Sequence, residues 1–257
     1  MPTSARLFCI ALALAFAGAP SAQVVNTEKM RLSDDVDGLS LDLAGAFAYA
    51  EGNTDYLQLS LGGRIDYRRE RDAAFVVGNL ALQRADGRAF LNEGFAHARY
   101  NRELVPRLVA ELFVQTQRNE AQLLERRYLA GAGLRAELLN GPVGGVAVGV
   151  TPMLEIERLA PEAGESTEGR GRLSSYLTTR IRLGEIVVFS NTVYVQPLMS
   201  DVGDLRVFDE VQLDLALTRF VKLRTRVNVR HDSRPPLDLD ETDLTIQNGV
   251  AVTFPAK

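Results

Sequence analysis

Arginines and carboxylates recur at every second position in several segments of this chain, a spacing that could line a passage with charge. Successive side chains of a β-strand point to opposite faces, so residues two apart share a face. Charges arranged in this way select ions in a water-filled pore. They can also plug a narrow lumen, because an arginine fork binds a carboxylate well where solvent is sparse. The predicted lumen-facing charged residues are Arg64, Asp66, Arg99, Glu111, Arg135, Glu137, Arg180, Arg182, Glu210, Asp214, Arg224, Arg226 and Arg230, and Glu93, Arg127 and Arg172 fall on the same faces.

The number of strands decides which of these two roles is favoured. Small barrels of about eight strands are filled by side chains, whereas barrels of about sixteen hold an aqueous channel. The amphipathic runs described below indicate about twelve strands. We therefore favour paired charges that fill the lumen over an open, ion-selective pore.

The two histidines, His97 and His231, are the residues that a hydrolase would use. With Asn101, Asp232 or Ser233 either could form a serine–histidine–acid arrangement if the groups converged on adjacent strands. His97 is expected to face the lumen near the opposite half of the sheet, His231 lies at a predicted strand end, and neither has a nucleophile motif beside it. The sequence therefore predicts no catalytic residues and no enzyme activity, with an outer-membrane lipid hydrolase as the alternative.

Two acidic segments offer the oxygen atoms that calcium accepts as ligands. One contains Asp238, Asp240, Glu241 and Asp243, and the other contains Glu155, Glu157, Glu162, Glu165 and Glu168. Neither has the spacing of an EF-hand, so we expect solvated acidic loops that hold a divalent cation weakly at most. No metal site and no cofactor are predicted.

The last two predicted strands, within Val221–Phe254, show most clearly the element that would position the charges. In the first of them Val221, Leu223, Val227 and Val229 take one parity, and the other parity is cationic or polar. About twelve amphipathic runs of roughly 10 to 14 residues follow one another from Leu39 onward. Each is long enough for a tilted membrane crossing, which takes about 9 to 11 residues. The predicted fold is all-β, a single antiparallel transmembrane β-barrel of about twelve strands.

Alternation alone does not distinguish a barrel in lipid from a barrel in water. In lipid, only a closed sheet pairs all its backbone groups while its apolar face points outward. In water, a barrel would turn the apolar face toward a filled interior. A soluble periplasmic ligand-binding β-barrel is therefore a second alternative.

The connections between the runs favour the membrane. Short periplasmic turns and longer outer loops are typical of outer-membrane barrels, and an even strand count places both termini in the periplasm. Tight turns are predicted at 70–72, 140–142, 183–185 and 218–220, and longer loops at 85–91, 119–124, 160–169, 200–206 and 233–241.

Both chain ends carry export features. Residues 1–22 have Arg6, an apolar core and small residues near Ala22, as a secretory signal peptide does. Residues 23–38 are expected to be a flexible periplasmic segment, and residues 39–254 the barrel. Without residues 1–22, the 29 basic residues become 28 against 33 acidic ones, a net charge of −5, and nothing indicates a nucleic-acid partner.

The predicted last strand ends in a polar-x-Gly-x-x-apolar-x-aromatic pattern. Gln247, Gly249, Val252 and Phe254 supply its four positions. The pattern resembles the terminal signal by which bacterial outer-membrane barrels are recognised for assembly. The resemblance implies the barrel-assembly machinery as a partner, together with outer-membrane lipid and lipopolysaccharide as surroundings.

Three short motifs resemble a known family. They are Glu51–Asp55 (EGNTD), Arg126–Arg135 (RRYLAGAGLR) and the D-x-x-P-P sequence that begins at Asp232, followed by the closing strand. Together with the signal peptide they are similar to the YdiY-like family of salt-induced outer-membrane proteins. The resemblance implies an outer-membrane barrel of a Gram-negative bacterium, structural or forming a narrow channel and linked to osmotic or salt stress. It supplies no catalytic residues.

Overall fold

The computed structural model describes residues 38–51, 55–85, 88–161, 167–184, 186–218, 221–236 and 239–252. The predicted signal peptide, the N-terminal segment as far as residue 37, and Phe254 of the predicted assembly signal lie outside these residues. Gly38, predicted to end the N-terminal segment, is instead the first residue of the first strand.

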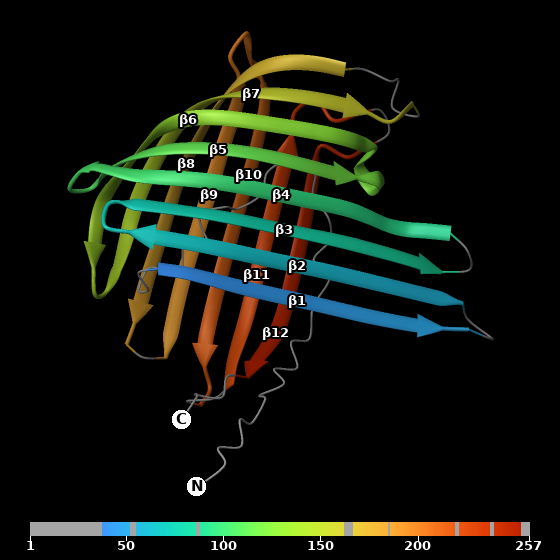
Figure 1. The fold of residues 1–257 in the computed structure, drawn as a ribbon, viewed down its shortest axis with the longest axis horizontal. Coiled ribbons are helices and arrows are strands. Elements are labelled where there is room, and N and C mark those ends of the chain that lie inside the picture. The colour runs from blue at the N-terminus through green and yellow to red at the C-terminus, as the bar shows by residue number, and fades with distance from the viewer. Residues whose placement is uncertain are drawn as a thin grey trace, which may run out of the picture.

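Twelve antiparallel strands form one sheet in which each strand pairs with the next along the chain (Figure 1). The predicted all-β fold with twelve antiparallel strands is confirmed. The strands are β1 Gly38–Ala50, β2 Tyr56–Arg69, β3 Asp72–Ala85, β4 Arg88–Val105, β5 Leu108–Asn119, β6 Leu124–Gly141, β7 Gly144–Leu159, β8 Thr167–Leu183, β9 Val187–Leu198, β10 Asp201–Ala216, β11 Val221–Asp232 and β12 Thr242–Val252.

The sheet curls so that its first strands lie in front of its last ones (Figure 1). A hydrogen bond from Tyr176 in β8 to Glu111 in β5, two strands that are not neighbours, spans the space enclosed by the curl. β1 and β12 are the two edge strands of the sheet, and the ladders of the described residues do not join them. Most residues of β1 are exposed on both faces, as expected for an edge strand.

The strands turn apolar side chains outward and polar ones inward, which is the reverse of a water-soluble domain. Within the described residues, nineteen of the buried side chains are polar or charged and nine are apolar, while thirty-five large apolar side chains are exposed. In water, both features would be unfavourable. The distribution is the one expected of a sheet surrounded by an apolar medium, with its polar face enclosed.

Successive connections lie alternately at the two opposite ends of the strands. We call these ends the turn end and the loop end. The turn end carries the segments 70–71, 106–107, 142–143, 184–186 and 217–220, and the loop end carries 51–55, 86–87, 120–123, 160–166, 199–200 and 233–241. The loop end also holds a short 3-10 helix, Glu120–Gln122, whose preceding Asn119 side chain accepts a hydrogen bond from the Gln122 amide at 3.2 Å.

Two of the longer loops that we predicted are wrong. The segment 200–206 is mostly strand, because β10 begins at Asp201 after the turn residues Met199 and Ser200. Asp204 and Arg206 are buried there. Asp204 forms an ion pair with Arg172 and Arg206 forms one with Asp232, and these contacts hold the polar segment in the sheet. The segment 85–91 is likewise mostly strand, since β4 begins at Arg88.

Helices contribute little to the described part of the chain. Among its residues, no helix has the length and apolar character needed to cross a membrane.

Close packing between β7 and β8 can be tested at Gly149, which pairs with Tyr176. A Cβ atom at Gly149 would overlap the Tyr176 ring. We expect Gly149→Ala to lower the free energy of unfolding by about 1–3 kcal/mol, because the ring has to move. Urea unfolding of the detergent-solubilised protein, followed by circular dichroism, measures the change.

Gly169→Ala in β8 is the matched control, since a Cβ atom there would meet nothing within 4 Å. Equal losses of stability in the two variants would contradict the packing of Tyr176 against Gly149.

Candidate functional site

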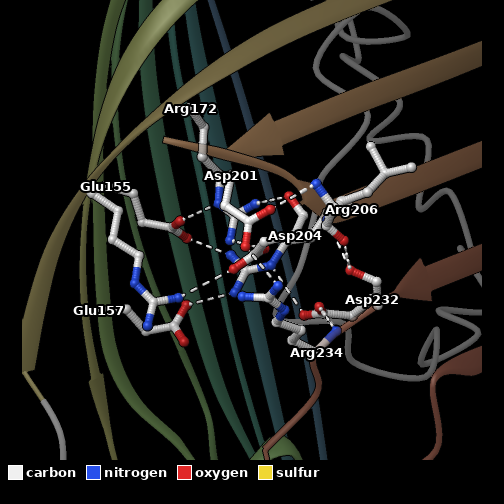
Figure 2. Close-up of polar contacts among 12 residues, drawn as sticks. Glu155, Glu157, Arg172, Asp201, Asp204, Arg206, Asp232 and Arg234 are labelled. Atoms are coloured by element: carbon white, nitrogen blue, oxygen red, sulfur yellow. Dashed lines mark hydrogen bonds and ion pairs between the residues drawn. The ribbon is translucent and has the colours of Figure 1, made fainter. Parts of the chain in front are cut away.

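Seven charged side chains from five strands meet inside the sheet near its loop end (Figure 2). We call them the ion-pair network; its members are Arg127 of β6, Glu155 and Glu157 of β7, Arg172 of β8, Asp204 and Arg206 of β10, and Asp232 of β11. All but Glu157 are buried, and Arg172 is 0% exposed. Alternate residues of each strand point inward. The five strands can therefore bring their charged side chains together while their backbones keep regular β-sheet pairing.

Glu155 is the centre of the network, since it contacts all three arginines. Its Oε2 accepts a hydrogen bond from Arg172 Nε at 2.6 Å, and its Oε1 accepts one from Arg206 Nη1 at 2.5 Å. Arg127 Nε lies 3.0 Å from the same Oε1. One carboxylate therefore offsets part of the charge of three buried guanidinium groups.

Both Nη atoms of Arg172 also have hydrogen-bond partners. Its Nη2 donates to Asp204 Oδ1 at 2.7 Å, and its Nη1 donates to the backbone oxygens of Gln196 and Asp204 at 3.1 and 3.3 Å. Arg170, which is partly exposed, approaches the other carboxylate oxygen of Asp204 at 3.5 Å. Arg172 thus joins β7, β8, β9 and β10 at one point.

Arg206 extends the network from β10 to β7 and β11. Its Nε donates to Asp232 Oδ2 at 3.0 Å, and its Nη2 reaches Glu157 Oε2 at 3.3 Å. Glu157 also pairs with Arg127. With Arg170 included, four arginines face four carboxylates, so the formal charges balance.

The D-x-x-P-P motif begins in this network. Asp232 Oδ1 accepts a hydrogen bond from the Arg234 amide at 3.0 Å, and Ser233 Oγ accepts one from the Leu205 amide at 2.8 Å. Arg234 in turn pairs with Asp201 at 2.6 Å (Figure 2). The first three residues of the motif therefore fasten the β11–β12 connection to the start of β10.

A second inward layer, of aromatic and charged groups, lies at mid-strand. Tyr176 donates to Glu111 Oε2 at 2.8 Å, and Arg99 Nη1 approaches the same oxygen at 3.8 Å. The rings of Tyr176 and Tyr194 lie 5.4 Å apart, and Phe208 follows Tyr194 at 6.4 Å. This layer connects β4 and β5 with β8, β9 and β10 across the interior.

His97 faces the interior, as predicted, and it is enclosed by aromatic rings. Phe75, Phe95 and Phe113 lie 5.7, 6.2 and 5.6 Å from it, and its Nδ1 lies 3.0 Å from Gln115 Oε1. His231 lies at the loop end of β11, 3.0 Å from Thr242 Oγ1. The two histidines are in different settings, and these contacts hold no serine–histidine–acid arrangement.

The inner face has a cavity at the turn end. The cavity has a volume of about 560 Å³, and Arg64, Asp66, Phe75, Arg107 and Glu137 contribute to its wall. Arg64 binds Asp66 through two parallel hydrogen bonds and lies 4.8 Å above the Phe75 ring. Within the described residues, the interior therefore holds a cavity with polar groups at one end and the buried ion-pair network near the other.

The predicted lumen-facing charges are distributed along the inner face, mostly as local pairs. The pairs are Arg64 with Asp66, Arg99 with Glu111, Arg135 with Glu137, Arg224 with Asp214, and Arg226 with Glu210. Arg230 lies over the Phe208 ring at 4.9 Å, Arg180 is half-buried and Arg182 is exposed at the turn end. The structure does not gather these residues into one site, and their role as a pore lining stays a prediction.

Five members of the ion-pair network were missing from the predicted lining. They are Glu155, Glu157, Asp204, Arg206 and Asp232. Asp204 and Arg206 lie an even number of residues before Glu210 and Asp214 and so share their inward-facing side of the strand. We did not include them because we predicted a loop at 200–206. The sequence pattern indicates an acidic loop around Glu155 and Glu157, whereas both lie on the inner face of β7.

The other acidic positions form no metal site in the part of the chain that the structure describes. Asp240, Glu241 and Asp243 are exposed there. Glu162, Glu165 and Asp238 lie outside the described residues, as does the side chain of Glu168. Gln247 and Gly249 of the predicted assembly signal lie in β12.

A curled sheet of twelve antiparallel strands with a charged interior and an apolar exterior defines the class of β-barrels that includes the porins. A solved structure described as "NanC porin structure in rhombohedral crystal form" is similar to this chain, with a TM-score of 0.50 and 8% sequence identity. The match covers 83% of this chain and 99% of that chain. At this identity the similarity concerns the fold.

The chain belongs to the family described as "Protein of unknown function, DUF481", whose model matches residues 44–254. No curated protein matches the chain.

The central position of Glu155 can be tested by Glu155→Gln, which keeps the shape of the side chain and removes its charge. Three buried guanidinium groups would then share too few carboxylates, so we expect a loss of about 3–5 kcal/mol in the free energy of unfolding. Urea unfolding in detergent measures it.

Asp72→Asn is the control, because Asp72 pairs with Arg102 at 3.1 Å where both side chains are a third exposed or more. Removing such a surface pair should cost at most about 1 kcal/mol. A Glu155→Gln protein as stable as Asp72→Asn would show that Glu155 is not the centre of the network.

Proposed function

We propose that this protein is an outer-membrane β-barrel without enzymatic activity, which forms a narrow channel constricted at its loop end. One observation carries the proposal: within the described residues, buried side chains are mainly polar or charged and large apolar ones are exposed. A protein in water gains by the opposite distribution, whereas a protein in lipid requires this one. The similarity of the fold to a solved porin structure supports the barrel part of the proposal.

Closure of the sheet follows from the same proposal. An unpaired strand edge in hydrocarbon leaves backbone groups without partners, at several kcal/mol for each group. β1 and β12 are antiparallel ends of the sheet and both carry outward apolar residues such as Leu43 and Ile246. In the membrane, β1 and β12 pair with each other.

The width of the channel is set by the two inward layers. The ion-pair network and the Tyr176 layer join non-neighbouring strands across the interior, while the turn end keeps a cavity of about 560 Å³. Paired charges leave less room for solvent than unpaired ones and bind each other well where water is sparse. Small ions pass through the remaining space more readily than nutrients of sugar size.

The partners proposed for such a barrel are those of its surroundings. Outer-membrane barrels have short turns on the periplasmic side and longer loops outside. The turn end therefore faces the periplasm, and the loop end faces the lipopolysaccharide of the outer leaflet. The chain-end pattern at Gln247, Gly249 and Val252 supports assembly by the barrel-assembly machinery. A link to salt stress and a Gram-negative source rest on the sequence resemblance alone.

The proposed location predicts the behaviour of the protein on SDS gels. We expect the protein in the outer-membrane fraction and expect its unboiled form to migrate faster than its boiled form, because a closed barrel resists SDS. Recovery in the soluble periplasm without such a shift would contradict the membrane assignment and favour a soluble ligand-binding barrel.

The constriction predicts a gain of conductance when the network is removed. Glu155→Ala combined with Arg172→Ala deletes one charge of each sign and should raise single-channel conductance in planar bilayers severalfold, because conductance follows the free width of the lumen. The wild-type protein should show small conductance steps.

The control exchanges Asp214 and Arg224 for alanine. This pair is also inward-facing, with 2.7 Å between Arg224 Nε and Asp214 Oδ1, but it lies near the turn end and Arg224 is 44% exposed. Its removal should leave the conductance nearly unchanged. Equal conductance in wild type and both double variants would place the constriction elsewhere.

A further inference from the structure

The outer face of the sheet has a shallow apolar groove that no step of the proposed channel uses. The groove has a volume of about 880 Å³ and crosses β3 to β8 at mid-strand. Its floor consists of small residues, Ala98, Ala130 and Ala132, between larger ones such as Tyr100 and Leu154. The register places Ala98, Val114, Ala130 and Leu154 side by side on four consecutive strands.

The groove ends at Met199, in the β9–β10 turn of the loop end. The Met199 amide donates to the Gly171 carbonyl at 2.8 Å, and a Cβ atom at Gly171 would touch the Met199 sulfur at 3.4 Å. Gly171 pairs with Leu154, whose side chain is 69% exposed. The methionine therefore lies over the outer face beside Gly171 and bounds the groove on the side of β9.

Three arginines lie above the groove on the same outer face. Arg118, Arg126 and Arg158 each lie four positions closer to the loop end than a groove residue, namely Val114, Ala130 and Leu154. Four residues span roughly 13 Å along a strand, at about 3.3 Å per residue. Arg126 and Arg158 are direct cross-strand partners, and all three side chains are exposed.

The three arginines differ in what already binds them. Arg158 Nε lies 2.7 Å from Glu125 Oε2, and both side chains of this pair are about half exposed. Within the described part of the chain, Arg118 and Arg126 make no side-chain hydrogen bond or ion pair. Tyr128 and Ile156, 48% and 50% exposed, separate the arginines from the groove. The surface therefore presents cations at the loop end and an apolar trough below them.

We propose that this surface binds lipid A, the phosphorylated and acylated anchor of lipopolysaccharide. An arginine fork matches a phosphate with two parallel hydrogen bonds, and Arg118 and Arg126 provide two such forks. Arg158, whose Nε is paired with Glu125, adds the N–H groups of its two Nη atoms. The groove holds an acyl chain, because its wall is apolar and its small residues leave space. This inference rests on the proposed outer-membrane placement, in which the loop end reaches the leaflet that contains lipopolysaccharide.

The test compares lipid A with other lipids on the full-length protein. Protein is inserted in phosphatidylcholine nanodiscs, bis-phosphorylated lipid A or phosphatidylglycerol is added, and bound lipid is counted by native mass spectrometry. We expect retention of lipid A at least tenfold above that of phosphatidylglycerol. A variant with Arg118→Gln, Arg126→Gln and Arg158→Gln should lose this preference, and Ala130→Phe should weaken it by filling the groove.

Arg69→Gln is the matched control, because Arg69 is also exposed on the outer face but lies at the turn end of β2. It should retain lipid A as the wild type does. Retention of lipid A by the triple variant, or equal retention of phosphatidylglycerol by the wild type, would overturn the proposal.

Each variant is also run on SDS gels with and without heating. A wild-type protein that shows the heat-dependent shift but no preference for lipid A would refute the lipid site and leave the barrel assignment intact. A wild-type protein without the shift would refute both. Variants that keep the shift have folded, so their loss of lipid A reports on the site itself.

Discussion

The rest of the structure depends on the neutralisation of charge inside the sheet. A guanidinium such as that of Arg172, with no exposed surface, would cost several kcal/mol to bury alone. The protein places carboxylates from three other strands within reach of its arginines, so that every member of the ion-pair network meets more than one partner or a backbone group. These contacts can form only if β6 to β11 curl toward a common point. The buried charges can therefore be neutralised only in a curled sheet.

The outer face imposes the complementary constraint. Because strand side chains alternate with a period of two, a slip of one residue would turn the inner charges outward and the leucines inward. The described ladders keep their register over most of their length, and the irregularities, such as those between Glu103 and Val105 and between Asp201 and Leu205, lie near strand ends. Mid-strand register is thus held by both faces at once, whereas the ends can adjust.

Much of the fold could be predicted from the sequence, since alternation is a local property. The runs at Leu57–Tyr67 and Val221–Arg230 indicate by parity alone which residues share a face. The network could not be predicted in the same way, because its partners are 17 to 51 residues apart, as Glu155 is from Arg172 and Arg206. Parity says that Arg206 points inward but not which carboxylate it meets. The prediction for the segment 200–206 failed for a related reason: its Asp, Gly and Ser residues are typical of loops, whereas the contacts that place Asp204 and Arg206 in the sheet are made with distant residues.

The neighbour-to-neighbour order of the strands has a consequence for how the protein folds. Every ladder from β1 to β12 joins segments adjacent in sequence. Closing a short loop costs little conformational entropy, so strands can be added one at a time. Each new strand pairs with the free edge of the strand before it. In the closed barrel that we propose, the junction of β1 with β12 is different, because it brings together the two edge strands of the sheet and can form only when all other strands are in place. Topology thus leaves one slow, entropically costly event to the end of assembly. Until then, the growing sheet has two free edges that must be kept from pairing with other chains.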